Sequence, residues 1–156
     1  MRTEISCEAD VACSPDRIFD IITDLGGQDR WLSHSTSFKG TTALSTETAQ
    51  VGTTYREPGP LGVRNGVVTE LVRPTRISFH QPMTLKFRLG VLDITVRYLL
   101  TPQGAGTHIR RKATLGLPRH LGFIAPVVVR ASRVEAARTL ASLKAFADSN
   151  GSDSAG

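Results

Sequence analysis

The stretch CSPDRIFDIITDLGGQDRW (residues 13–31) carries a complete signal for a short helix, followed closely by the chain's only tryptophan. Ser14 is a favourable N-cap and Pro15 fits the first helical position, where a backbone N–H is not needed. One apolar stripe follows at helical spacing: Ile18, Phe19, Ile21 and Ile22. The pair Gly26–Gly27 is expected to end the helix. A short amphipathic helix is therefore predicted, with Trp31 just beyond its end.

Short strands separated by turn residues are predicted before this helix and through the middle of the chain. The expected strands are residues 3–11, 35–46, 51–57, 65–72, 76–82, 86–100 and 107–115. In 86–100 the apolar positions change from odd to even numbers after Gly90, which predicts a bulge or bend there. Because short turns join consecutive strands, an antiparallel sheet is favoured.

The C-terminal part is predicted to be one long helix, from about His120 to Asp148. Its apolar stripe includes Val129, Ser132, Ala136, Leu140, Leu143 and Ala147. Pro126 should kink this helix or mark its start, because proline lacks the N–H that a helix interior requires. Residues 1–148 are thus expected to form a single α+β domain, and the polar Gly/Ser-rich tail 149–156 is expected to be disordered.

Composition narrows the class of protein. Hydrophobic residues make up 40% of the 156 and charged residues 21%, which is typical of a globular domain. No apolar run approaches the roughly 20 residues of a membrane span, and the acidic N-terminal segment 1–13 lacks the apolar core of a signal peptide. A cytoplasmic location is therefore expected. Cys7 and Cys13 belong to no Cys/His cluster, so no metal and no cofactor is expected.

The net charge of +5 comes from scattered basic residues rather than from a long basic run. This scatter argues against nucleic acid as a partner and favours a solvated surface. The outer side of the long helix nevertheless carries several basic residues: Arg119, Arg130, Arg133, Arg138 and Lys144. It is the best place for an acidic partner or an anionic surface to dock.

Several landmarks together resemble a known superfamily. They are the segment Ser14–Asp20 with Thr23-Asp24-Leu25 and Trp31, the pair Val51-Gly52, the strand pair 67–79 around Pro74, and the turn between residues 100 and 107. This pattern resembles the START/birch-pollen-allergen superfamily (the helix-grip or SRPBCC fold), and locally its bacterial polyketide cyclase/dehydrase branch. The resemblance implies a curved antiparallel sheet of about seven strands wrapped on the long C-terminal helix, with two short helices after the first strand. It also implies that Trp31 wedges between these short helices and the long one.

Candidate site residues follow from the faces of the predicted strands. The sequence contains no GxSxG, HExxH, Walker or dinucleotide motif. Strand parity turns Arg111 inward, together with Tyr55 and Tyr98. A buried charge needs a partner, so Arg111 either lies near a strand end, pairs with an inward acid, or binds a ligand carbonyl or carboxylate. The candidate ligand-binding residues are Trp31, Tyr55, Phe79, Phe87, Tyr98, Arg111 and Phe123.

Three functions remain open from the sequence. The first is binding of a small hydrophobic or aromatic molecule, such as a lipid, polyketide or isoprenoid, in a cavity between sheet and helix. The second is a polyketide cyclase or dehydratase, in which Arg111, Tyr55 and Tyr98 would orient carbonyls and stabilise an enolate. The third is a regulatory or toxin-like protein that acts through its basic surface.

Overall fold

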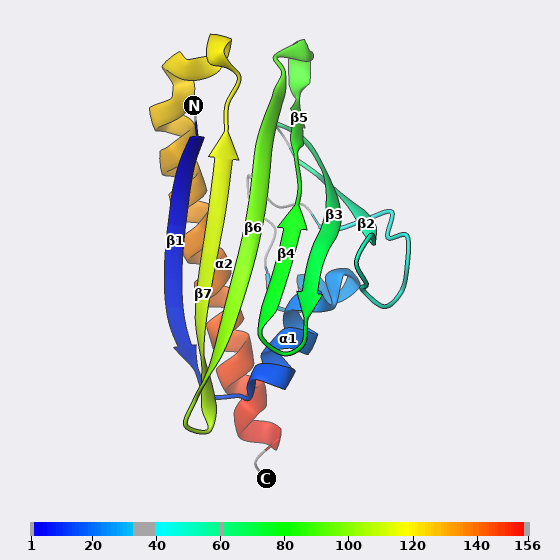
Figure 1. Ribbon diagram of the computed structural model, residues 1–156, viewed down its shortest axis with the longest axis vertical. Helices are drawn as coiled ribbons and strands as arrows, with labels where there is room; N and C mark the ends of the chain where they lie inside the picture. Colours follow the sequence, from blue (N-terminus) through cyan, green and yellow to red (C-terminus); the bar gives the residue numbers. More distant parts are fainter. Residues whose placement is uncertain (1, 33–39, 60, 155–156) are drawn as a thin grey trace.

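The computed structural model describes residues 2–32, 40–59 and 61–154, and it consists of one curved antiparallel sheet with a long helix lying across it (Figure 1). In chain order the elements are β1 (Arg2–Val11), α1 (Pro15–Thr23), the 3-10 helix η1 (Leu25–Arg30), β2 (Thr54–Pro58), β3 (Gly62–Val72), β4 (Arg76–His80), β5 (Met83–Leu85), the 3-10 turn η2 (Lys86–Arg88), β6 (Val91–Gln103), β7 (Gly106–Gly116), the 3-10 helix η3 (Arg119–Ile124) and α2 (Ala125–Ser154). The strand order is β1-β7-β6-β4-β3-β2, and β5 pairs with β3 and β6. The predicted α+β helix-grip fold is confirmed.

The first short helix begins as the sequence predicts and ends slightly earlier. The Ser14 hydroxyl accepts a hydrogen bond from the Arg17 backbone N–H at 3.3 Å, which caps α1. The four residues of its apolar stripe are all buried. Gly26 and Gly27 do not end α1 but lie inside η1. A Cβ atom at Gly27 would meet the Asp24 carboxylate, so a larger residue there would displace the Asp24 side chain.

The segment predicted as one strand over 86–100 is divided in the structure. Residues 86–88 form η2, where Phe87 and Arg88 have positive φ angles of 61° and 54°. Gly90, with φ 131°, then redirects the chain into β6. The change in apolar parity therefore marks a turn, and only the residues after it belong to the strand. On β6 the even positions from Leu92 to Leu100 are buried, as the sequence predicts.

The strand expected at 35–46 lies partly outside the described residues, since 33–39 are not described. Within 40–46 the chain forms no strand and makes a single β-bridge, between Thr42 and Arg56.

The long helix α2 is fixed to the sheet by its C-terminal half. Leu140, Leu143 and Ala147 are buried, and Leu143 has no exposed surface. The Ala12 backbone N–H donates to Asp148 at 2.8 Å, which ties the end of β1 to this half of the helix. Pro126 is the second residue of α2 and therefore marks its start. At its other end α2 continues to Ser154, past the boundary at residue 148 that the sequence indicated.

Leu143→Asp should unfold the protein or lower its stability by at least about 3 kcal/mol, because it places an unpaired charge on the buried face of α2. Thermal unfolding followed by circular dichroism measures this loss. Ala141→Asp, on the exposed side of the same helix, is the control and should unfold close to the wild-type temperature. Equal melting temperatures for the two variants would contradict the packing described above.

Candidate functional site

A two-part cavity lies between the inner face of the sheet and α2. The larger part, called here the apolar chamber, has a volume of about 270 Å³. The smaller part, the polar chamber, has a volume of about 70 Å³ and lies nearer η1. Both chambers are lined by the same five residues at their junction: Arg64, Gln81, Val96, Arg111 and Glu135. The junction is thus polar and carries both signs of charge.

The apolar chamber exists because the inward positions of β6 and β7 carry aliphatic side chains of unequal size. Its wall includes Leu92, Ile94, Ala113 and Leu115 from the two strands, and Ile124, Val128 and Ala136 from η3 and α2. Well-packed interiors contain few voids larger than one water molecule, whereas an apolar cavity of about 150 Å³ already holds benzene. The apolar chamber therefore has room for a larger apolar group.

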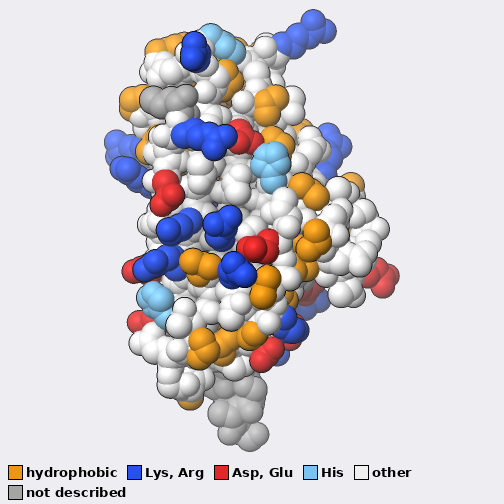
Figure 2. Space-filling view, in the orientation of Figure 1, with side chains coloured by type: hydrophobic (Ala, Val, Ile, Leu, Met, Phe, Trp, Pro, Cys, Tyr) orange, Lys and Arg blue, Asp and Glu red, His pale blue; other side chains and the backbone are white. Residues whose placement is uncertain are grey.

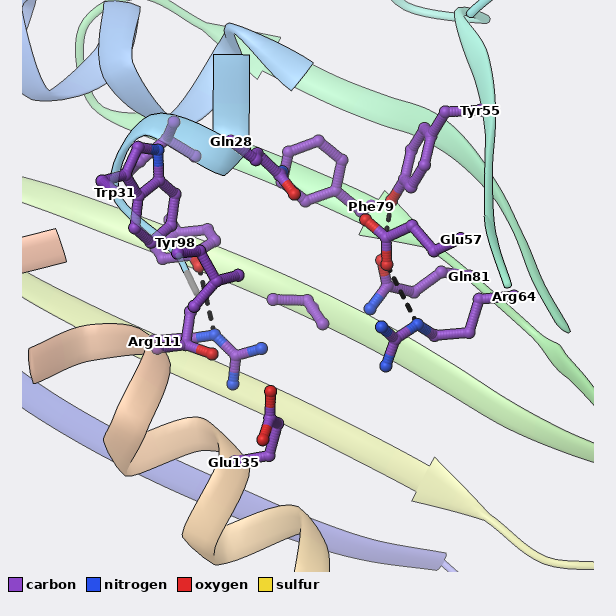
Figure 3. Close-up of a pocket in the computed structure, with 14 residues that line it drawn as sticks. Gln28, Trp31, Tyr55, Glu57, Arg64, Phe79, Gln81, Tyr98, Arg111 and Glu135 are labelled. Atoms are coloured by element: carbon purple, nitrogen blue, oxygen red, sulfur yellow. Dashed lines mark hydrogen bonds and ion pairs between the residues drawn. The ribbon is translucent and has the colours of Figure 1, made fainter. Parts of the chain in front are cut away.

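Aromatic rings form one wall of the polar chamber (Figure 3). Phe79 lies between Tyr55 and Tyr98 and makes an edge-to-face contact with each, at centroid distances of 6.0 and 6.4 Å. The Tyr55 hydroxyl donates to Gln81 Oε1 at 2.7 Å. Burial raises the pKa of the Tyr55 phenol, so this hydroxyl stays protonated and acts as a donor.

Arg111 projects from β7 into the junction of the two chambers. Its Nε–H donates to the Tyr98 hydroxyl at 3.2 Å, and its guanidinium lies 5.7 Å from the Tyr98 ring centroid. Glu135 on α2 points toward it in Figure 3, but the Glu135 carboxylate is bound by Arg138, with an N–O distance of 2.6 Å. No ion pair to Arg111 is found among the described residues, and its remaining N–H donors are available to the cavity.

A second arginine at the junction is held differently. Arg64 Nε lies 3.0 Å from Glu57 Oε2, and both side chains are largely buried. The two residues are directly opposite each other in the β2–β3 register, so their pairing follows from the sheet itself. Thr41 also donates to Glu57, at 3.2 Å. This pair is a structural element of the chamber wall.

Comparison with known proteins identifies the family. The family described as "Polyketide cyclase / dehydrase and lipid transport" matches residues 2–147. The chain belongs to this family. No curated protein sequence matches it significantly.

The family's fold is also found among solved structures. A truncated norcoclaurine synthase from Thalictrum flavum is 14% identical, with a TM-score of 0.69 over 94% of this chain and 93% of that one. Ara h 8.0201 is 11% identical, with a TM-score of 0.69 over 96% and 99%. The Aha1 dimer from Colwellia psychrerythraea is 17% identical, with a TM-score of 0.66 over 94% and 96%. At these identities the likeness shows the fold alone. Together with the family match over residues 2–147, it confirms the resemblance to the START/birch-pollen-allergen superfamily.

The structure brings together five of the seven candidate residues. Trp31, Tyr55, Phe79, Tyr98 and Arg111 all line the polar chamber. Phe87 and Phe123 line neither chamber and are 90% and 80% exposed. This differs from the expectation, because the positive φ of Phe87 in η2 turns its ring outward and because Phe123 lies on the solvent side of η3.

Three charged residues that line the polar chamber were not among the candidates from the sequence: Glu57, Arg64 and Glu135. A signal was present for Glu57, which is two residues from Tyr55 and therefore shares its inward face. Glu135 lies one residue before Ala136 of the predicted stripe, at the edge of the buried helix face.

Neither a metal centre nor a membrane-spanning helix is found within residues 2–32, 40–59 and 61–154. These residues contain no group of three or more His, Cys, Asp or Glu side chains placed to hold a metal ion. None of their helices is both long and apolar enough to cross a bilayer.

Glu57→Gln should lower the stability by about 3 kcal/mol, because it removes the carboxylate charge that lies 3.0 Å from the largely buried Arg64 guanidinium. The double variant Glu57→Gln/Arg64→Met should recover most of this loss, since it removes the unpaired charge as well. Urea unfolding of the three proteins measures both effects. A double variant less stable than Glu57→Gln alone would contradict this interpretation of the pair.

Proposed function

We propose that the protein binds an amphipathic small molecule, with its apolar or aromatic body in the apolar chamber and a carbonyl or carboxylate group at Arg111. The observation that carries this proposal is the state of Arg111, a cation that enters the cavity without an ion pair among the described residues. A half-buried charge of this kind is costly unless something binds it. Lipids, polyketides and isoprenoid-like compounds that carry an oxygen function have the required chemistry.

The geometry of the junction suits an oxygen ligand. One N–H of Arg111 is fixed by Tyr98, which orients the planar guanidinium before a ligand arrives. The other N–H groups form a rigid fork that matches a carboxylate or two neighbouring carbonyl oxygens. An apolar chamber with few polar groups at one end is the usual design of small-molecule sites. Orientation is therefore set by the polar group, and most of the affinity comes from the apolar body.

Catalysis of a cyclase or dehydratase type is the second candidate. It is favoured by the two carboxylates that enter the polar chamber, Glu57 and Glu135, and by the family's description. The similar norcoclaurine synthase is named as an enzyme. However, a general base must be able to reach a substrate proton, and each carboxylate is already in an ion pair, with Arg64 and Arg138 respectively. Binding is therefore the better supported function.

Arg111→Leu should weaken the binding of a fluorescent long-chain fatty acid by about 1.5–3 kcal/mol, as expected for loss of one charge-assisted hydrogen bond. The melting temperature of the empty variant should stay the same or rise, because removing a half-buried charge that has no ion pair relieves a cost. Arg110→Leu is the control, since Arg110 lies on the opposite face of β7 and pairs with Glu8. A less stable Arg111→Leu protein with unchanged affinity would refute the proposal.

The enzymatic candidate is tested with a linear poly-β-keto thioester, followed by chromatography of its cyclised products. If Glu135 acts as a base, the wild-type protein should raise the rate of cyclisation above background and Glu135→Gln should abolish the increase. Equal rates with wild-type protein, with Glu135→Gln and without protein would exclude cyclisation of this substrate and leave binding as the function.

A further inference from the structure

The apolar chamber reaches the protein surface at the end of the molecule where η2 and η3 lie. Its lining includes exposed side chains, among them Leu61 and Val127, which are 68% and 72% exposed. The two 3-10 segments are joined there, because His120 Nε2 of η3 lies 2.6 Å from the carbonyl oxygen of Leu89, just after η2. The rim of the opening, called here the mouth, is thus built from the β5–β6 turn, η3 and the start of α2.

Large apolar side chains project outward around the mouth. Phe87 and Phe123 are 90% and 80% exposed, on η2 and η3 respectively. The ring of Phe87 is held outward by a left-handed backbone conformation, which is uncommon for a residue other than glycine. Single exposed apolar residues are normal, but a group of them beside an open apolar chamber marks an interaction surface.

Two segments at this end of the molecule carry only positive charge. Segments 83–92 and 117–134 contain no Asp or Glu, and their basic residues are Lys86, Arg88, Arg119, Arg130 and Arg133. Among the described residues none of these five forms an ion pair, whereas Arg138 and Lys144, farther along α2, are paired with Glu135 and Asp148. Figure 2 shows basic, histidine and hydrophobic side chains together at the upper end, where η2 and η3 lie in Figure 1.

We propose that the mouth docks on an anionic phospholipid bilayer, with Phe87 and Phe123 inserted at the interface and the surrounding basic residues on the lipid headgroups. Basic residues attract anionic headgroups while apolar side chains enter the acyl boundary, and either contribution alone gives weak binding. A bilayer fits this surface better than a folded acidic protein does, because the projecting rings lie on η2 and η3, the two segments beside an opening that a fluid surface can fill. Docking in this position would bring the apolar chamber directly against lipid.

The proposal is tested by flotation of the full chain with phosphatidylcholine vesicles, with and without phosphatidylserine. Wild-type protein should float with the vesicles that contain phosphatidylserine and not with phosphatidylcholine alone. Arg88→Gln/Arg119→Gln should weaken vesicle binding about fivefold for each charge removed.

Phe87→Ser/Phe123→Ser should weaken vesicle binding at least about tenfold. The matched controls Val51→Ser and Arg56→Gln, exposed residues at β2 and just before it, should bind as the wild type does.

A spectroscopic measurement reports insertion separately from binding. Phe87→Trp should be quenched by anionic vesicles with brominated acyl chains more strongly than wild type, whose only tryptophan is Trp31, and Val51→Trp should not. Fatty acid binding without vesicles should be unchanged in Phe87→Ser/Phe123→Ser, so failure here is distinguishable from failure of the proposed function. Three results would each overturn the proposal. They are equal flotation of Phe87→Ser/Phe123→Ser and wild type, release of the protein from the vesicles by soluble polyglutamate alone, and no added quenching of Phe87→Trp.

Discussion

The structure depends on the unequal packing of one long helix against one curved sheet. In its C-terminal half, α2 presents Leu140, Leu143 and Ala147 to the sheet and excludes solvent there. In its N-terminal half, the residues that face the sheet are small or only half buried, from Val128 to Ala136, and they line the apolar chamber instead. Because the C-terminal half supplies the tight packing, the N-terminal half can stand over a cavity without loss of the fold.

The polar groups of the cavity fall into two kinds with different consequences. Glu57 with Arg64, and Glu135 with Arg138, are ion pairs that satisfy their own charges and shape the wall. Arg111 is different, because its one hydrogen bond to Tyr98 leaves the charge itself uncompensated by a carboxylate. A charge in an ion pair helps to fix the shape of the cavity wall, whereas a charge without an ion pair can form one with a ligand. This contrast, rather than the number of polar groups, locates the candidate binding site.

The fold could be predicted from the sequence to the extent that its signals are local. The N-cap at Ser14, the helical stripe of α1, the strand parities of β6 and β7, and the stripe of α2 all depend on residues close in the chain, and the structure has each of them. The change of apolar parity predicted a bend at Gly90, but it did not predict the η2 turn before it. The reason is that Phe87 and Arg88 adopt left-handed backbone conformations, which usually require glycine. Phe87 and Phe123 were candidates for the ligand site, and here both lie on the surface and line neither chamber.

The site was predictable only in part, for the same reason. Strand parity alone turned Tyr55, Tyr98 and Arg111 toward one space. Strand parity cannot show which acidic side chain pairs with which basic one across the cavity. That pairing depends on strand register and on the distance between α2 and the sheet. Arg138 binds Glu135 at an i,i+3 spacing on α2, a pair that the sequence alone could suggest. Whether Glu135 also reaches Arg111 on β7 depends on how the helix is placed over the sheet, which no single strand or helix encodes.

The position of Arg111 on β7 also fixes its distance from the other residues of that strand that line the cavity. The next inward residues on the same strand are Ala113 and Leu115, and both line the apolar chamber. Successive inward residues on a strand lie about 6.6 Å apart, so Leu115 is about 13 Å from the anchor. A ligand bound at Arg111 as proposed would pass the small side chain of Ala113 first and then meet the larger Leu115. On this wall of the cavity, the spacing and the size of these side chains would limit both the length and the width of such a molecule.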